Sequence, residues 1–479
     1  MFLGYKSLQD PSSQNDYLEF SDDHLGKYDE ETLKLMVRRV QFLIVSILNN
    51  TENYLDSEEY QKNVQELTEL VYKVDFKDAD QDDLNNFFNH LLKYSGENNY
   101  HNIGKKENLF ISLVKLNLSF MSQSAESIIY EFINCGLLKY LNFLLSNAFP
   151  TRLDVDVYEA LARIVGKSSR IQKEILNIIP IKGIDARVKS NKDNEKFLDA
   201  IFKFLCPFTM KDNNLNSDEI YWIMKAYMEG LKLGQPKIYP MISIGIYEKI
   251  KSVQSIKNYY NKFGFKLEQI FPLLVERMDQ NEILCEYTFY ISKILLNLEI
   301  KIDIDYPKFQ SYLNCPSLKV QIASVYFFSS LAQNVDILKK QKLDVANFLW
   351  ELHLVYQNAS YVIKEYLDET IYFYLILDIY DKDKLFPILE RGFTDTLVQI
   401  IQTQKKNLYN ILIFVNKMFE RSVRLQCIDQ LSNQFMNCGG FSVLYDFFND
   451  SEFISSDENV ETLELLKIII QDYEPKDDL

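Results

Sequence analysis

Glycine and proline are scarce in this sequence. The chain has 14 glycines and 11 prolines among 479 residues, well below the roughly 7% and 5% that these residues reach in average proteins. Because both residues mark sharp turns, a chain with so few of them changes direction rarely. The shortage disfavours β-sandwiches, β-barrels and α/β folds, which need many tight loops.

Histidine and cysteine are also rare, and their spacing matches no familiar site. The four histidines include no pair at i and i+4 and no H-E-x-x-H motif, and none is next to a cysteine. We therefore expect no metal and no cofactor, and we predict that the chain is not an enzyme. No C-x-x-C pair occurs, so reduced and packed thiols are expected in place of disulfides or zinc ligands. The six cysteines are Cys135, Cys206, Cys285, Cys315, Cys427 and Cys438.

Two short segments resemble ligand-binding loops, and both lack residues that such loops need. Residues 166–169 read GKSS, like the end of a phosphate-binding loop, but Leu161 stands where that loop requires its first glycine. Asp78, Asp80 and Asp82 have the spacing of the first three ligands of an EF-hand, but the glycine at the sixth position and the glutamate at the twelfth are missing. We predict neither nucleotide nor calcium binding.

Long apolar runs and a secretory pattern at the N-terminus are absent as well. No clean apolar run approaches the ~18–20 residues that a bilayer span requires. Acidic residues outnumber basic ones by 68 to 52, giving a net charge of −16, and an acidic field repels phosphate groups. We expect a soluble intracellular protein, in the cytoplasm or alternatively the nucleus, without membrane insertion and without nucleic acid as its main partner.

Apolar residues recur with helical spacing along the chain. Val157, Tyr158, Leu161, Ile164 and Val165 fall on one face of a helix, which Asp154 or Asp156 could cap. The segment IYFYLIL at 371–377 would suit a strand, but its charged flanks favour a buried helix. The sequence therefore predicts an all-α fold. Further helices are expected at 33–50, 107–121, 217–231, 281–297, 317–333, 359–379 and 406–419.

One sequence pattern occurs three times. Residues 132–145 read FINCGLLKYLNFLL, and residues 435–448 read FMNCGGFSVLYDFF. Residues 389–401, LERGFTDTLVQII, keep the glycine and the apolar positions that follow it. The glycines are 256 and 47 residues apart, and one sixth of the longer interval is about 43, within the ~40–47-residue period of helical repeats.

This pattern has a physical explanation. Glycine turns sharply at the end of one helix, and the next helix then presents an apolar face that only a neighbouring unit can cover. The chain resembles the armadillo/HEAT family, in which such a glycine separates the second and third helices, as Gly136, Gly392 and Gly439 would here. The resemblance implies an all-α, armadillo-like right-handed superhelix of stacked helical repeats, with roughly nine to eleven units. We place this α-solenoid at residues 31–472, between a mobile acidic arm at 1–30 and an acidic tail at 473–479.

Basic residues concentrate in the middle of the acidic chain. Residues 160–268 carry 19 basic and 11 acidic side chains, whereas residues 1–100 carry 9 and 20. If this segment lines a groove, it could bind an acidic segment of another protein. The alternatives are ordinary solvated lysines, RNA whose bases stack on tyrosines, or the acidic ends of the chain itself. The candidate groove residues are Arg187, Lys189, Lys192 and Lys196 in one predicted loop, and Lys251, Lys257, Tyr259, Tyr260, Lys262 and Lys266 in a second stretch.

The predicted function is that of a non-catalytic intracellular scaffold or adaptor, which holds extended or helical segments of partner proteins in the groove. Two alternatives remain open, a nuclear transport receptor or adaptor and an RNA-binding helical-repeat protein. Import adaptors of the armadillo family carry a ladder of Trp and Asn residues. Only Trp222 and Trp350 occur here, and neither is followed by Asn four residues later. The sequence therefore does not predict recognition of basic import signals.

Overall fold

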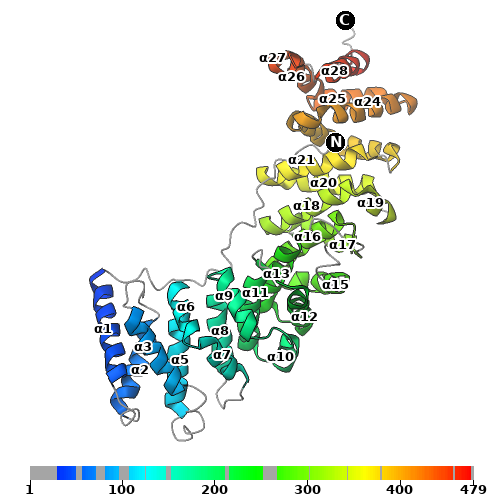
Figure 1. Cartoon of the computed structure of the whole chain (residues 1–479). Coiled ribbons are helices and arrows are strands. Elements are labelled where there is room, and N and C mark those ends of the chain that lie inside the picture. The colour runs from blue at the N-terminus through cyan, green and yellow to red at the C-terminus, as the bar shows by residue number, and fades with distance from the viewer. Residues whose placement is uncertain are drawn as a thin grey trace. The chain divides into compact units, whose positions relative to one another are not determined.

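A computed structural model of the chain is almost entirely helical (Figure 1). No strand occurs among the residues that it describes, so the predicted all-α class is confirmed. No helix in that part of the chain is long and apolar enough to cross a membrane. The described residues are 30–49, 57–71, 81–95, 107–123, 126–146, 153–210, 215–251, 267–300, 302–341, 343–377, 380–456 and 459–475.

The described helices fall into two compact units, and the boundary lies within helix α13, after Lys249. Each unit is described here by itself. The helices of the first unit are α1 (Glu30–Asn49), α2 (Glu58–Val71), α3 (Gln81–Ser95), α5 (Glu107–Gln123), α6 (Glu126–Asn134), α7 (Leu137–Ser146), α8 (Leu153–Val165), α9 (Ser169–Ile178), α10 (Ile184–Ser190), α11 (Glu195–Met210), α12 (Ser217–Leu233), η4 (Pro236–Ile238) and most of α13 (Tyr239–Lys251).

The second unit is also built from short helices joined by brief turns. Its members include two 3₁₀ turns that extend the preceding helix and one π-helical turn, η8. They are α15 (Leu267–Arg277), η5 (Met278–Gln280), α16 (Glu282–Asn297), α17 (Tyr306–Ser311), η6 (Tyr312–Asn314), α18 (Leu318–Gln333), α19 (Val335–Gln341), α20 (Val345–Asn358), α21 (Tyr361–Ile376), η7 (Lys382–Leu385), α22 (Phe386–Ile388), η8 (Leu389–Phe393), α23 (Thr394–Thr403), η9 (Lys405–Asn407), α24 (Leu408–Arg424), α25 (Ile428–Asn437), α26 (Gly440–Asn449), α27 (Ser451–Ile454) and α28 (Val460–Tyr473).

The predicted helices agree closely with the observed ones. The segment 217–231 becomes α12, 281–297 becomes α16, and the ambiguous 371–377 lies at the end of α21, where Ile371 and Leu375 are buried. One detail was wrong: α8 begins at Leu153, so Asp154 and Asp156 lie inside its first turn and do not cap it. At the chain ends, α1 already includes Glu30 and α28 includes Tyr473, while the rest of the predicted arm lies outside the described residues.

In the first unit, helices three places apart in the series stack directly on one another. Helix α2 packs against α5, α5 against α8, and α8 against α11 (Figure 1). We call this succession the α2–α11 row. Aromatic rings of α3, α5 and α6 pack against one another next to this row. The ring centres of Phe88 and Phe132 stack 3.9 Å apart, and Phe120 meets Phe87 edge-on at 5.2 Å. These side chains are almost fully buried, so the row is held by apolar packing.

The second unit has its own row of stacked helices. Helix α16 packs against α18, α18 against α21, α21 against α24, and α24 against α28 (Figure 1). The rings of Phe289, Phe309 and Phe327 meet between α16, α17 and α18, and Phe309 and Phe327 lie 4.9 Å apart. Tyr374 of α21 donates a hydrogen bond to the carbonyl of Phe328 at 3.2 Å. Helix packing of this kind is compatible with a helical repeat protein.

The glycines of the repeated pattern lie at corners between consecutive helices. Gly136 separates α6 from α7, Gly392 lies just before α23, and Gly439 separates α25 from α26. All three have left-handed backbones, with φ of 103°, 109° and 77°, a conformation that glycine adopts without steric cost. Gly183, at the start of α10, is a fourth such corner with φ of 83°. The repeated sequence pattern did not include it.

The two best-matching corners also share their hydrogen bonds. The Gly136 amide donates to the carbonyl of Ile133 at 2.9 Å, and the Gly439 amide donates to Met436 at 2.9 Å. Each glycine carbonyl then accepts a bond from the residue four positions later, at 3.1 and 3.0 Å. The predicted equivalence of these two corners is therefore confirmed at the level of the backbone.

Candidate protein-binding surface

Five of the ten predicted groove residues lie in the described part of the chain. Arg187 and Lys189 belong to α10, so the stretch predicted as a loop contains a helix. Lys192 follows α10, and Lys196 lies in the first turn of α11. Lys251 is the last residue of α13 and belongs to the other unit. The other five, Lys257, Tyr259, Tyr260, Lys262 and Lys266, lie outside the described residues.

Arg187 connects two helices of the first unit. Its Nη1 donates a hydrogen bond to the hydroxyl of Tyr158 on α8 at 3.0 Å. Burial raises the pKa of Tyr158, and the guanidinium offsets part of that rise. Because Tyr158 is 2% exposed, its hydroxyl needs this partner. Arg187 therefore acts mainly as a structural contact.

Buried carboxylates hold other lysines of this region in place. Glu229 of α12 is 6% exposed and contacts Lys232 at 2.9 Å and Lys189 at 3.4 Å. Asp185 of α10, also 6% exposed, contacts Lys225 of α12 at 3.1 Å. The pairs of Lys189 with Glu229 and of Lys225 with Asp185 join α10 to α12, and the pairing of Lys189 neutralises part of the predicted basic surface.

Lys192 and Lys196 are positioned as the sequence analysis predicted, as basic side chains exposed at the surface. Both are exposed, and neither makes an ion pair within the described residues. The carbonyl of Lys192 accepts a hydrogen bond from Gln235 at 2.8 Å, which fixes the chain but leaves the ammonium free. Nearby, the Lys225 ammonium lies 4.7 Å from the centre of the Trp222 ring, a cation–π contact. Among the predicted groove residues that the structure describes, Lys192 and Lys196 are therefore exposed cations that remain available to a partner.

Polar residues also follow the α2–α11 row, and the sequence analysis missed them. Thr68, Lys115, Glu159 and Lys203 lie on α2, α5, α8 and α11, at intervals of 47, 44 and 44 residues. These intervals equal the repeat period. The signal was therefore present in the sequence, as polar residues recurring at repeat spacing within otherwise apolar helices.

A pocket of about 240 Å³ opens on this row between α2, α5 and α8. We call it the row pocket. Burial raises the pKa of Asp156, although Lys115 opposes that rise. Burial and the charge of Asp156 likewise raise the pKa of Glu159, against the opposing charges of Lys203 and Arg163. Its lining residues are Thr68, Lys115, Leu118, Ser119, Asp156, Glu159, Ala160 and Arg163.

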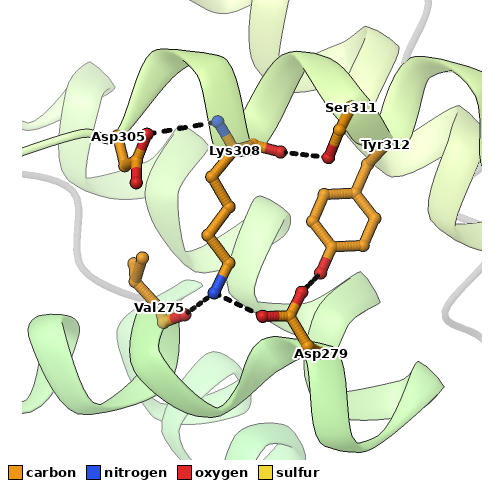
Figure 2. Close-up of polar contacts among 6 residues, drawn as sticks. All are labelled: Val275, Asp279, Asp305, Lys308, Ser311 and Tyr312. Carbon is orange, nitrogen blue, oxygen red and sulfur yellow. Dashed lines mark hydrogen bonds and ion pairs between the residues drawn. The ribbon is translucent and has the colours of Figure 1, made fainter.

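The second unit contains a polar network of a different kind (Figure 2). The Lys308 ammonium of α17 donates to the carbonyl of Val275 at 2.8 Å and contacts Asp279 at 2.6 Å. The Tyr312 hydroxyl donates to the other oxygen of Asp279. Burial alone would raise the pKa of Asp279, but the bonds from Lys308 and Tyr312 lower it below its ordinary value. The network joins the end of α15 to α17 and η6.

Burial shifts the pKa values of several described thiols and of His90 away from neutrality. Burial raises the pKa of Cys206, Cys285 and Cys438 to about 12 in each case, so these thiols stay protonated at neutral pH. Burial and nearby Lys93 lower the pKa of His90 to about 4. His353 is 1% exposed, and its Nδ1 lies 2.8 Å from the Thr396 hydroxyl. In the described residues, no group of histidine, cysteine, aspartate or glutamate is arranged to hold a metal ion.

The segment that resembled a phosphate-binding loop has a structural role. Helix α8 leads directly into it, and Ser168 caps α9 by accepting a hydrogen bond from the amide of Ile171 at 3.2 Å.

The sequence matches no known protein family. Comparison with curated proteins finds no match either.

Proposed function

We propose that the chain is a non-catalytic scaffold or adaptor of the armadillo/HEAT type, whose helical units stack in a right-handed superhelix. It would hold extended or helical segments of other proteins, acidic ones at Lys192 and Lys196, in the cytoplasm or the nucleus. The observation that carries this proposal is the row of helices in each unit, because successive helices one repeat apart offer a continuous surface along which a segment can bind.

The side-chain chemistry supports binding over catalysis. Polar residues recur along the α2–α11 row at repeat spacing, so a bound segment would meet one polar side chain per repeat. The described cysteines with raised pKa values are weak nucleophiles. An interface of this kind gains little from each contact and depends on many of them.

Site-specific photo-crosslinking tests the proposal. We would place a photo-reactive amino acid in the full chain at Lys115 or Lys203 on the row, or at Lys192, and identify the adducts formed in a lysate of the source cells. Matched controls are the exposed Lys139 of α7 and Lys173 of α9. We expect defined protein adducts from the first three positions and none from the controls.

The outcomes separate the alternatives. Adducts destroyed by ribonuclease would favour RNA binding, and adducts that require a GTP-loaded small GTPase would favour a transport receptor. Identical adducts from all positions, or none from any position, would contradict the scaffold proposal.

A further inference from the structure

The row pocket holds two carboxylates that have no ionic partner. Asp156 and Glu159 lie one turn apart on α8 and both line the pocket. Among the described residues, neither forms an ion pair within 4.0 Å or accepts a side-chain hydrogen bond. Carboxylates three positions apart on a helix face the same side and repel each other. This pair is therefore placed to receive a cation from outside.

Among the described residues, the basic residues of the pocket form no ion pair with these two carboxylates. Lys115 and Arg163 line the same pocket but lie beyond pairing distance of both carboxylates. Lys203, the next cation along the row, is already bound by Asp199 at 2.8 Å. Burial raises the pKa of both acids, and the charges of Lys115 for Asp156 and of Lys203 and Arg163 for Glu159 offset only part of that rise.

The rest of the lining suits a long aliphatic side chain. Leu118 and Ala160 also line the pocket and are only 4% and 3% exposed, so apolar side chains form part of its wall beside the polar Thr68 and Ser119. Lysine and arginine bury their aliphatic stems against such surfaces while their charged ends seek carboxylates. A pocket of about 240 Å³ offers both features together.

We propose that the row pocket binds a single arginine or lysine side chain from a partner protein segment, with the cationic head between Asp156 and Glu159 and the stem against Leu118 and Ala160. The inference rests on the proposed function, because it assumes that a protein segment lies along the row. It adds the chemistry of one contact, a charge-assisted hydrogen bond from partner to scaffold.

The same pocket disfavours a run of basic residues. Lys115 and Arg163 stand beside the carboxylates, so a second cation next to the first would meet like charge. The preferred segment therefore carries one isolated basic residue, flanked by neutral or acidic positions that suit Lys115.

Peptide selection on the full chain tests this inference. We would select short random peptides displayed on phage against the immobilised chain and synthesise the most enriched ones. Each would also be made with citrulline in place of arginine, or acetyl-lysine in place of lysine, which keeps the shape and removes the charge. We expect an isolated basic residue at one fixed position and about ten-fold weaker binding after its neutralisation.

Variants locate the contact. In D156N/E159Q the neutralised peptide should bind as well as the basic one, whereas the control D193N/E69Q, which removes two exposed charges of the same unit, should keep the ten-fold difference. The variant K115Q should bind the basic peptide more tightly, because it removes a repelling charge. A folding defect would not produce that gain.

Three results would overturn the inference: enriched peptides without a basic residue, a preference for basic runs, or an undiminished citrulline effect in D156N/E159Q. In those cases peptides still bind, so the scaffold proposal survives. If no peptide is enriched on the full chain, both the inference and segment binding by this row are rejected.

Discussion

In the second unit, Lys308 and Lys382 place their ammonium groups on backbone carbonyls near the ends of preceding helices. Lys308 reaches Val275 of α15 at 2.8 Å, and Lys382 reaches Leu375 of α21 at 2.6 Å. In the first unit, by contrast, Lys115 lines an open pocket without an ion pair. A lysine at a helix C-terminus satisfies unpaired carbonyls and opposes the helix dipole. The second unit therefore uses these cations for its own stability, while the first keeps one available at its surface.

The two units nevertheless share one local device. Gly136 and Gly183 in the first unit are 47 residues apart, and so are Gly392 and Gly439 in the second. All four have left-handed backbones where one helical segment gives way to the next. The units therefore agree in how the backbone turns at these corners, whereas Lys115 of the first unit and Lys308 and Lys382 of the second differ in what they contact.

The largest expected effect comes from emptying one aromatic core at a time. Phe132 in the first unit and Phe327 in the second are both fully buried, and replacing either by alanine should cost about 3–5 kcal/mol of unfolding free energy. If each unit has a core of its own, hydrogen exchange should accelerate in the mutated unit and stay slow in the other.

The matched controls are Leu35→Ala and Leu354→Ala, which truncate side chains that are 60% and 42% exposed. These should change stability by under about 0.5 kcal/mol. Equal loss of protection in both units after either phenylalanine substitution would show that the two units unfold as one. The expectation that each unit has a core of its own would then be wrong.

A smaller effect is expected at the shared corners. Gly136→Ala and Gly392→Ala should each cost about 1–2 kcal/mol, because their φ angles of 103° and 109° strain any residue with a Cβ atom. Nothing lies within 4 Å of the position of the added methyl group at either site, so a cost would arise from the backbone alone. Denaturant unfolding measures it. Gly166→Ala, without a positive φ, is the control and should be neutral or slightly stabilising.

Much of the fold could be predicted from the sequence because local patterns determine it. Apolar residues at helical spacing placed α12, α16, α18 and α21 within a few residues of their observed bounds. The recurring glycine marked three corners because few other residues can adopt that backbone conformation. Gly183 was missed because the residues around it do not repeat the pattern.

The candidate site was harder to predict because it depends on contacts between distant residues. Lys189 looked like a free cation, but Glu229, forty residues later, lies beside it in the structure. The row pocket joins residues of α2, α5 and α8, and Asp156, one of its two carboxylates, looked like a helix cap in the sequence. The repeat spacing of Thr68, Lys115 and Glu159 could be found in the sequence, but the stacking of helices was needed to show that they share a pocket with Asp156 and Arg163.

The smallest expected effects have opposite signs in the two units. The pKa of Asp279 lies below its ordinary value of 3.8, so its interactions stabilise the fold above about pH 4 and are lost as the pH falls further. The pKa values of Asp156 and Glu159 lie above their ordinary values of 3.8 and 4.5. Ionising these two groups therefore costs stability, and that cost appears as the pH rises through their folded pKa values.

We expect Lys308→Met to cost about 1 kcal/mol at pH 7, mostly through the bond to Val275, because Asp279 is 59% exposed and solvent screens the ion pair. The deficit should narrow below pH 4. D156N/E159Q should instead raise the melting temperature slightly at pH 7, and the gain should disappear toward pH 4. Thermal melts of both variants between pH 3 and pH 7 measure this, with Lys339→Met, an exposed lysine without an ion pair in the described residues, as control. Parallel pH profiles for the two variants would mean that charged groups in the two units are not used differently.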